Sequence, residues 1–511
     1  MAHESLMETF AQKRRTILQM GGAEKLDRQQ REGRLNARER IDLLFDKGTF
    51  QETGMFGHSD RPEMAERTPA DGKITGFGHI TGRPSAVVAQ DITVLAASSA
   101  GTNRRKITYL KNMSTRRGIA MVFLSEGGGG RIPDDMGSAN MTSSGQDPTS
   151  FLHLRETPWV SCLFGPCYGS PAWYACMSDF VVMTRKAVMA VASPKVSQLA
   201  TGEDTPAEEL GGWKVHSEIT GFVDAVVETD EECIEMAKKF LLFLPPNANQ
   251  TPQKAEVPAQ SGRNMPSILK HLPESRRRTY DVRRILECIA DGEELFELKK
   301  NFGRALVTSL ARLNGNSVGF IANNPMYLGG AIDADACEKA TSFLVLCDSF
   351  NLPVIMIVDT PGFMIGKEGE RKKAIGKIVN FMNALQLVTV PKITVVIRKS
   401  YGQAYLNMGG GKNSDSYVAW PTAEISFMGP EPAVNVVYGI TEEQDREKFA
   451  ELKEQVEKES MPWDAAGKFY LYDILEPAQT RDWLIRMLDY HMDRRTGGIG
   501  RHLMSSWPNA F

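Results

Sequence analysis

One segment of the chain occurs twice. Residues 82–172 align without a gap to the residues 233 positions further on. Few aligned pairs are identical, and matches of apolar or polar class carry most of the register. The clearest pairs are Gly82 with Gly315, Ala89 with Ala322, Lys106 with Lys339, Glu126 with Asp359, and Tyr168–Gly169 with Tyr401–Gly402. Sites often lie where such units meet, so the paired positions are the first candidates for function.

The composition is that of an ordinary soluble globular protein. The chain has 511 residues, 42% hydrophobic and 24% charged, with a net charge of −3, and is long enough for two or three domains. No basic field attracts nucleic acid or an anionic membrane, and no apolar stretch approaches the ~20 residues that span a bilayer. The first residues resemble neither a secretion signal nor a transit peptide. We expect a cytoplasmic protein without nucleic-acid or membrane partners.

Cysteine and histidine are scattered along the chain. None of the 7 cysteines forms a C-x-x-C pair, and the 8 histidines do not cluster. Zinc sites need clustered ligands, and an odd, dispersed set of cysteines indicates buried reduced thiols. We therefore expect no metal site in this chain.

Short apolar runs alternate with helical patterns in both copies. Strands are predicted at 85–89, 119–124, 160–164, 318–322, 354–358 and 393–397, and helices at 106–117 and 336–347. This alternation predicts an α/β fold whose sheets are buried by helices.

Composition divides the chain into four parts. Residues 1–40 predict a helical arm. A first domain at 40–245 and a second at 276–511 are separated by the proline-rich linker 246–275.

An apolar strand leads into a small-residue turn, and then into a helix, at equivalent places in both copies. The first turn is GPCYGSP (165–171) and the second is YGQAY (401–405). Helix N-termini present unpaired N–H groups, which suit a carbonyl oxygen or an anion. Pro171 has no N–H, so a donor pair in the first turn must be Gly169 and Ser170. In the second turn the equivalent pair is Gly402 and Gln403, with Ala404 next. Two facing pairs would form two oxyanion holes.

Several familiar catalytic motifs are missing. The sequence contains no G-x-S-x-G nucleophile elbow, no H-E-x-x-H and no G-x-x-x-x-G-K-[ST] loop. The four glycines at 127–130 lack the spacing of a dinucleotide fingerprint. Oxyanion holes without an evident side-chain catalyst suggest substrates that carry their own chemistry.

The whole chain resembles a known family. The repeated unit is similar to the crotonase-type ββα spiral fold, duplicated in tandem. The chain resembles the carboxyltransferase (beta) subunits of biotin-dependent acyl-CoA carboxylases, nearest to the propionyl-CoA carboxylase type. The stretches that carry the match are GGAEKLDRQQREGRLNARERIDLLFDKGTFQE (21–52), DGKITGFGHITGRP (71–84), AQDITV (89–94), TGEDTPAEELGGWKVHSEITGFVD (201–224), YDVRRILECIADG (280–292), DTPGF (359–363), AWPTAEISFMGPEPAV (419–434) and LEPAQTRDWLIRML (475–488).

The resemblance implies a reaction and its partners. Carboxybiotin on a separate carrier would release its carboxyl group, and the enolate of an acyl-CoA would take it up. The chain lacks an ATP-grasp region and an A-M-K-M biotinylation motif. An alpha subunit with biotin carboxylase and biotin carrier would therefore be required. The family commonly forms hexamers, with each site joining the N-terminal half of one subunit to the C-terminal half of another.

The resemblance also assigns roles to residues. Gly169 and Ser170 would hold the thioester oxygen, and Gln403 and Ala404 the ureido oxygen of biotin. The acyl-CoA side would add Gly128, Gly129, Gly130, Arg131 and Tyr168. The biotin side would add Tyr401, Gly402, Leu406, Gly362 and Phe363.

Departures from the family pattern leave alternatives open. The usual D-S-G-G-A-R loop is Glu126–Arg131 here, the G-P-C-A-G-G-A turn carries Tyr168, Ser170 and Pro171, and Gln403 replaces a glycine. Gln403 would strain the backbone if its position needs a positive φ. A biotin-independent acyl-CoA decarboxylase and a non-catalytic paralogue are the alternatives.

Three single positions have two interpretations each. Arg131 contacts a CoA phosphate or is a surface arginine. Leu406 borders the acyl pocket or packs in the core. Glu126 and Asp359 form a carboxylate pair or, more simply, cap helices.

Overall fold

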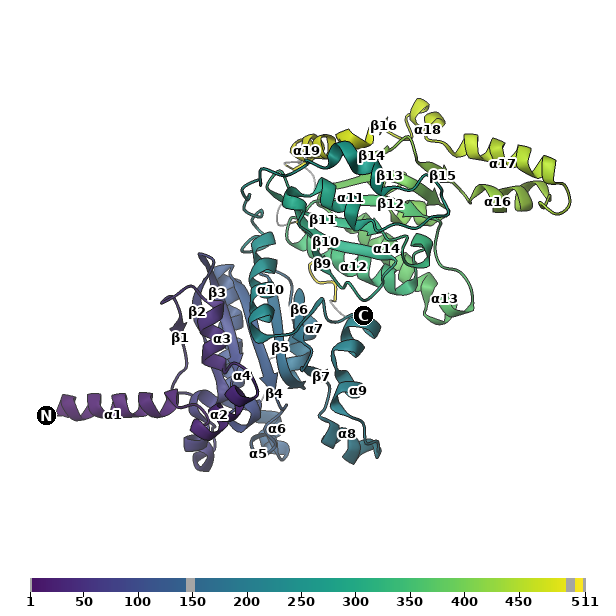
Figure 1. Ribbon diagram of the computed structural model, residues 1–511. Coiled ribbons are helices and arrows are strands. Elements are labelled where there is room, and N and C mark those ends of the chain that lie inside the picture. Colours follow the sequence, from purple (N-terminus) through teal and green to yellow (C-terminus); the bar gives the residue numbers. More distant parts are fainter. Residues whose placement is uncertain (1, 144–151, 493–500, 509–511) are drawn as a thin grey trace. The chain divides into compact units, whose positions relative to one another are not determined.

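The computed structural model describes residues 2–143, 152–492 and 501–508. It divides into two compact units, Met1–Ala248 with Ser506–Phe511, and Asn249–Ser505. The division falls inside the predicted linker 246–275. Within the described residues each unit holds one eight-stranded sheet with helices packed on it (Figure 1).

The sheet of unit 1 has the strand order β1-β2-β3-β4-β5-β6-β8, with β7 paired to β5. Its strands are β1 Gln51–Glu52, β2 Lys73–Ile80, β3 Arg83–Gln90, β4 Ala120–Gly127, β5 Trp159–Tyr168, β6 Phe180–Thr184, β7 Val188–Ala190 and β8 Ala225–Val227. The strands β1, β2 and β3 pair antiparallel, and the rest of the sheet is parallel. Every residue of β4 is buried, as expected for a parallel strand covered on both faces.

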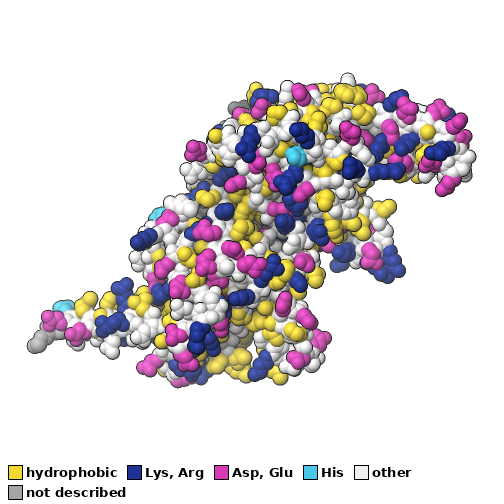
Figure 2. Space-filling view, in the orientation of Figure 1, with side chains coloured by type: hydrophobic (Ala, Val, Ile, Leu, Met, Phe, Trp, Pro, Cys, Tyr) yellow, Lys and Arg dark blue, Asp and Glu magenta, His cyan; other side chains and the backbone are white. Residues whose placement is uncertain are grey.

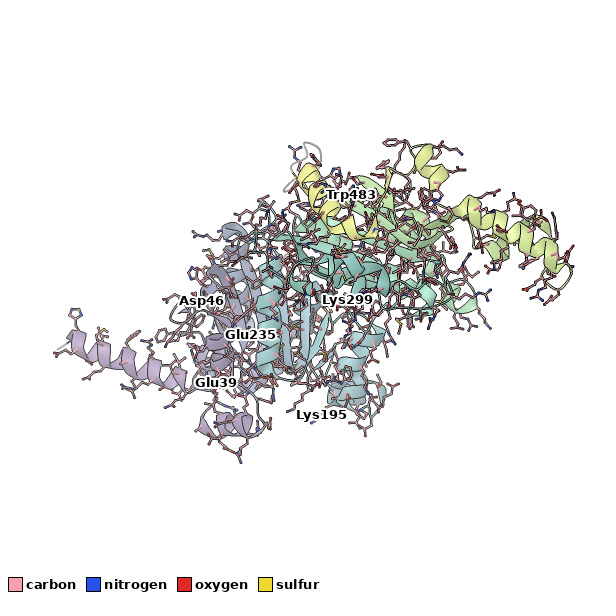
Figure 3. The ribbon with its side chains drawn as sticks, turned by 45° about the horizontal axis from the view of Figure 1, so that its top comes forward. Glu39, Asp46, Lys195, Glu235, Lys299 and Trp483 are labelled. Atoms are coloured by element: carbon pink, nitrogen blue, oxygen red, sulfur yellow. The ribbon has the colours of Figure 1, made fainter. Side chains whose placement is uncertain are left out.

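The helices of unit 1 connect these strands and extend before them. They are α1 Ala2–Leu18, α2 Ala23–Arg31, α3 Ala37–Leu44, α4 Gly101–Arg117, α5 Ile132–Asp135, α6 Ser138–Ser143, α7 Ser170–Met177, α8 Pro194–Thr201, α9 Ala207–Gly211 and α10 Asp230–Phe243. α1 stands away from the sheet (Figure 1), and most of its side chains are exposed. α3 starts with a capping box of Asn36 and Glu39, the latter labelled in Figure 3. α4 ends, as predicted, at left-handed Gly118.

Unit 2 repeats the sheet of unit 1 strand for strand. Its order is β16-β14-β13-β12-β11-β10-β9, with β15 paired to β13. Its strands are β9 Phe296–Leu298, β10 Leu306–Leu313, β11 Asn316–Asn323, β12 Val354–Thr360, β13 Lys392–Tyr401, β14 Ser416–Ala419, β15 Glu424–Ser426 and β16 Asp473–Ile474. Strands β9 to β11 again pair antiparallel and the others parallel.

The helices of unit 2 enclose a large apolar core. They are α11 Arg283–Ile289, α12 Ala334–Ser349, α13 Lys367–Arg371, α14 Ala374–Leu387, α15 Ala404–Asn407, α16 Pro430–Ala433, α17 Arg446–Ser460, α18 Trp463–Gly467 and α19 Thr480–His491. Trp483 of α19 (Figure 3) packs against this core. Met265 and Ile268, from the 3₁₀ turn η6 (Met265–His271), are buried in it. The second half of the predicted linker is therefore structured as part of unit 2.

The gapless repeat is present in three dimensions. β2, β3 and β5 begin and end 233 positions before β10, β11 and β13. Single hydrogen bonds repeat as well. The Ser99 amide donates to Gly129 O at 2.8 Å, and the Ile332 amide donates to Gly362 O at 3.0 Å. The predicted pair of similar α/β units is confirmed.

The surface carries both signs of charge. Acidic and basic side chains are interspersed on the face shown in Figure 2. Among the described residues, no helix has the length and apolar character needed to cross a bilayer.

Candidate functional site

The turn between β5 and α7 is the first predicted oxyanion turn. Gly169 has φ 68° and ψ −123°, a conformation that only glycine adopts readily. Its amide donates to Ala190 O of β7 at 3.3 Å. The Ser170 amide, at the first position of α7, makes no hydrogen bond to any described residue. The Gly169 amide is therefore already hydrogen-bonded, and the Ser170 amide is the one unpaired donor of the expected pair.

The turn between β13 and α15 is its counterpart. Gly402 has φ 62°, and its amide donates to Ser426 O of β15 at 3.1 Å. The amides of Gln403 and Ala404 make no hydrogen bonds within the described parts of the chain. Here two consecutive open amides follow the occupied glycine, at the positions assigned to the ureido oxygen.

Gln403 sits in the turn without strain. Its φ of −64° and ψ of −26° are those of a right-handed helix, and the positive φ falls on Gly402 instead. Its side chain is exposed, with a weak contact of 4.0 Å from Nε2 to Met382 Sδ. The condition for strain at Gln403, a positive φ, is therefore not met, and this removes backbone strain as a reason to favour the biotin-independent decarboxylase.

A glycine loop lies against the first turn. The Gly128 amide donates to Ala96 O at 2.8 Å, and the Cα of Gly129 lies 3.6 Å from where a Cβ on Gly169 would sit. A Cβ on Gly129 would lie 3.5 Å from Tyr168 O. The structure thus places the predicted Gly129 against Tyr168 and Gly169, with Gly128 and Gly130 as its neighbours in the loop.

The second turn has the same neighbour. Gly362, at φ 127°, follows β12, and a Cβ on it would lie 3.8 Å from Tyr401 O. Phe363 is half-buried, and forms an isolated bridge with Ile332. Leu406 is half-buried on α15. The Tyr401 hydroxyl donates to Glu424 at 2.5 Å, and burial, reinforced by Glu424, raises the pKa of Tyr401.

Arg131 is neither exposed nor free. Its side chain is 3% exposed, and Nη1 donates to Asp71 Oδ1 at 2.6 Å while Nη2 donates to Ser98 O at 3.1 Å. Burial raises the pKa of Asp71, although Arg131 opposes this shift. The interpretation of Arg131 as a surface arginine is therefore wrong: its guanidinium ties the end of the glycine loop to Asp71 and Ser98. Its contact with a CoA phosphate stays a prediction.

Glu126 and Asp359 end equivalent strands but cap no helix. Their amides donate to equivalent side chains, Gln90 Oε1 and Asn323 Oδ1, at 3.1 Å in both copies. The Glu126 carboxylate is paired with Arg34, and with Arg40 at 2.8 Å. Both carboxylates are buried and form ion pairs with arginines, Glu126 with Arg40 and Asp359 with Arg398. Helix capping was therefore the wrong interpretation.

Asp359 has a different set of partners. It accepts from Tyr280 Oη and Arg398 Nε, both at 2.9 Å. Burial raises the pKa of Tyr280 well above its usual value. Arg40, Tyr280 and Arg398 lie far from these carboxylates in sequence, and no local pattern signals the pairing.

A left-handed turn beside the glycine loop was also missed. Leu95, Ala96 and Ala97 have φ values of 46°, 53° and 48°, which is unfavourable for residues with a Cβ. In the second copy the equivalent residues are Leu328, Gly329 and Gly330, also at positive φ. The two glycines of the second copy are the sequence signal that could have revealed this turn.

Six of the seven cysteines are buried. All seven are free. Cys167 lies in the first turn, and burial raises its pKa to about 12, so its thiol is not poised as a nucleophile. In the described parts of the chain, no three His, Cys, Asp or Glu side chains gather as metal ligands.

Comparisons with known proteins agree with this geometry. The carboxyl transferase domain family matches residues 28–499. The methylmalonyl-CoA carboxyltransferase 12S subunit of Propionibacterium freudenreichii subsp. shermanii is 34% identical over 504 residues, covering 96% of this chain and 95% of its own. The human mitochondrial propionyl-CoA carboxylase beta chain is 32% identical over 493 residues, covering 93% of this chain and 89% of its own.

Solved structures match over the same extent. The transcarboxylase 12S hexamer, with methylmalonyl-CoA bound, superposes with a TM-score of 0.90 at 34% identity, covering 96% of both chains. A single-chain, multi-domain long-chain acyl-CoA carboxylase gives a TM-score of 0.84 at 31% identity, covering 94% of this chain and 48% of that one. The predicted tandem crotonase-type fold is confirmed.

Proposed function

The chain belongs to the carboxyl transferase domain family, and from this we propose that it is the carboxyltransferase subunit of a biotin-dependent acyl-CoA carboxylase. It moves a carboxyl group from carboxybiotin to the α carbon of an acyl-CoA. The observation that carries the proposal is the pair of equivalent turns with open amides, Ser170 in one copy and Gln403 with Ala404 in the other.

The first turn acts on the acyl-CoA. The Ser170 amide donates to the thioester oxygen, which gains negative charge when the α proton leaves. Gly128, Gly129 and Gly130 let the thioester approach the main chain closely, beside Tyr168. Preorganised donors of this kind stabilise an enolate more than the neutral thioester.

The second turn fits the ureido group of biotin. Gln403 and Ala404 supply two adjacent unpaired N–H donors, which suit one carbonyl oxygen, and the Gln403 side chain is exposed. When bound, carboxybiotin supplies the carboxyl group and then a ureido nitrogen that takes the α proton. We assign the same biotin side to Tyr401, Gly402, Gly362, Phe363 and Leu406, and the closeness of Gly362 to Tyr401 O supports this assignment.

The remaining parts of the reaction come from other chains. The relative solved as a hexamer supports a hexamer of this chain. An alpha subunit supplies the ATP-dependent carboxylation of biotin and the biotin carrier. We place the complex in the cytoplasm.

The reverse reaction tests this proposal without the alpha subunit. The purified chain is incubated with methylmalonyl-CoA and free biotin, and propionyl-CoA is measured. We expect propionyl-CoA to be released only when biotin is present. Release of CO₂ at the same rate without biotin would instead establish a decarboxylase. No turnover with malonyl-, methylmalonyl- and longer carboxyacyl-CoAs would reject carboxyl transfer.

A further inference from the structure

Unit 1 contains a line of three polar side chains that ends at the first turn. Lys73 Nζ of β2 donates to Ala97 O at 3.1 Å and to Ser99 Oγ at 3.4 Å. Ser99 Oγ lies 2.7 Å from Ser170 Oγ. Lys73 is 0% exposed and Ser99 5%, whereas Ser170 is half-buried. The line therefore runs from the interior to the open amide of Ser170.

The second copy shows that the fold does not require these groups. The positions equivalent to Lys73, Ser99 and Ser170 hold Leu306, Ile332 and Gln403. The backbone is nevertheless the same: Leu306 starts β10 as Lys73 starts β2, and Ile332 keeps the two main-chain bonds of Ser99. A buried lysine is costly, so its presence in one copy alone calls for a function of that copy.

The first turn also lacks a donor that the second turn has. The Gly169 amide is taken by Ala190 O, and Pro171 has no N–H, so Ser170 offers a single amide where Gln403 and Ala404 offer two. An oxyanion hole needs more than one donor to hold a developing charge well.

The charge of Lys73 favours one direction of hydrogen bonding along the line. An ammonium group only donates, so Ser99 Oγ accepts from Lys73. Either hydroxyl can donate in the contact between Ser99 and Ser170, and a hydroxyl that accepts from an ammonium is the stronger donor of the two, which favours Ser99 as the donor to Ser170 Oγ. With Ser99 as the donor, the Ser170 hydrogen is free to point away from Ser99. Successive hydrogen bonds polarise one another, which strengthens the last donor.

We propose that the Ser170 hydroxyl is the second donor to the thioester oxygen, oriented by Ser99 and Lys73 as positioning residues. The inference rests on the proposed function of this turn. No proton leaves the line. The hydroxyl hydrogen bond shortens as the enolate oxygen gains charge.

The charge of Lys73 sets a pH dependence. Burial lowers the pKa of Lys73 to about 7, opposed by Asp71 and assisted by Arg131, Lys106 and Arg104. Below this pKa the ammonium holds the line in the donating direction. Above it the neutral amine can accept a hydrogen bond, the line can reverse, and the contribution of the hydroxyl declines as pH rises.

A matched pair of variants tests the hydroxyl in the biotin-dependent assay. Ser170→Val and Ser170→Thr have the same shape, and both retain the amide, but only threonine retains the O–H. We expect the kcat of Ser170→Val to be about 10²-fold below that of wild type, with its KM within about twofold of wild type. The kcat of Ser170→Thr should be close to that of wild type. Equal kcat in the two variants, with an active wild-type chain, would overturn this inference alone. An inactive wild type would reject the proposed function itself.

Variants that copy the second unit test the positioning residues. Ser99→Ile and Lys73→Leu should each lower kcat, as Ser170→Val does. The melting temperature of each variant shows whether it is folded. Where Lys73→Leu fails to fold, Ser99→Ile interrupts the same line. The kcat ratio of wild type to Ser170→Val should decrease between about pH 6 and about pH 8.5. A constant ratio would overturn the role of Lys73.

Discussion

Lys106 and Lys339 make the same contact in the two copies. Lys106 Nζ donates to Lys73 O at 2.5 Å, and Lys339 Nζ donates to Leu306 O at 2.8 Å. Each lysine, on α4 or α12, therefore fastens its helix to the first residue of the strand beneath it. Lys106 also bonds Ala70 O, and Lys339 also bonds the carbonyls of Lys299 and Phe302.

These two lysines should differ in how much stability they provide. Lys339→Met leaves the carbonyls of Phe302 and Leu306 without a donor among the described residues, because Lys299 O still accepts from the Phe302 amide. Lys106→Met leaves only the carbonyl of Lys73, because Ala70 O still accepts from the Lys73 amide. Each buried unsatisfied acceptor costs about 1–3 kcal/mol, so we expect Lys339→Met to lower the melting temperature of unit 2 by more than Lys106→Met lowers that of unit 1. Differential scanning calorimetry of both variants gives the comparison. A larger loss in Lys106→Met would show that these carbonyls find other partners.

Removing the open amide of the first turn should stop the reaction. Ser170→Pro deletes the N–H and the hydroxyl together, while proline suits the start of a helix. We expect turnover at or below the detection limit, with the oligomer unchanged in analytical ultracentrifugation. Ser170→Val, which keeps the amide, should retain more activity than Ser170→Pro. Normal turnover in Ser170→Pro would disprove the role of this turn.

The second turn should respond to an analogous change. The φ of Gln403, −64°, is that of a proline, so Gln403→Pro removes one N–H with little change in backbone. We expect biotin-dependent turnover to fall by about 10²–10³-fold, and acyl-CoA binding in calorimetry to be kept. Gln403→Ala retains the amide and should lose less. Equal losses in the two variants would place the effect in the side chain.

Arg131→Ala should act on stability and not on acyl-CoA affinity. The change leaves the Asp71 carboxylate, 0% exposed, without its ion pair, which costs about 3–5 kcal/mol. We expect a lower melting temperature and, under conditions where the variant is folded, a KM near that of wild type. A raised KM for the acyl-CoA with an unchanged melting temperature would instead show that Arg131 contacts a CoA phosphate.

The same variant should be less destabilised in acid. Burial already raises the pKa of Asp71, and loss of Arg131 raises it further. Between the unfolded and folded pKa values the folded state binds more protons, so its stability falls as pH rises. The difference in melting temperature between wild type and Arg131→Ala should therefore be smaller at about pH 5 than at about pH 8. A deficit independent of pH would show that Asp71 keeps another cation nearby.

The sequence predicted the backbone better than the side-chain contacts. Predicted strands such as 393–397 lie inside longer strands of the structure, here β13 (Lys392–Tyr401), because apolar runs and glycine turns are local signals. Ser99 and Ser170 are 71 residues apart, and no local pattern reports such a contact. The Gly169 amide donates to β7, a strand of three residues that was not predicted from the sequence. Polar pairs that form on folding, such as Arg131 with Asp71, escape prediction for the same reason.

The equal spacing of the two copies has a consequence for how this protein can change. From the start of β2 to the end of β5, and from the start of β10 to the end of β13, the numbering runs in parallel with no insertion or deletion. Lysine has been exchanged for leucine and serine for isoleucine on this frame, yet its length has stayed constant. The strands β2, β3 and β5 thus hold different side chains from β10, β11 and β13 at the same backbone positions, and a point replacement on these strands can exchange the chemistry of one half for that of the other without altering chain length.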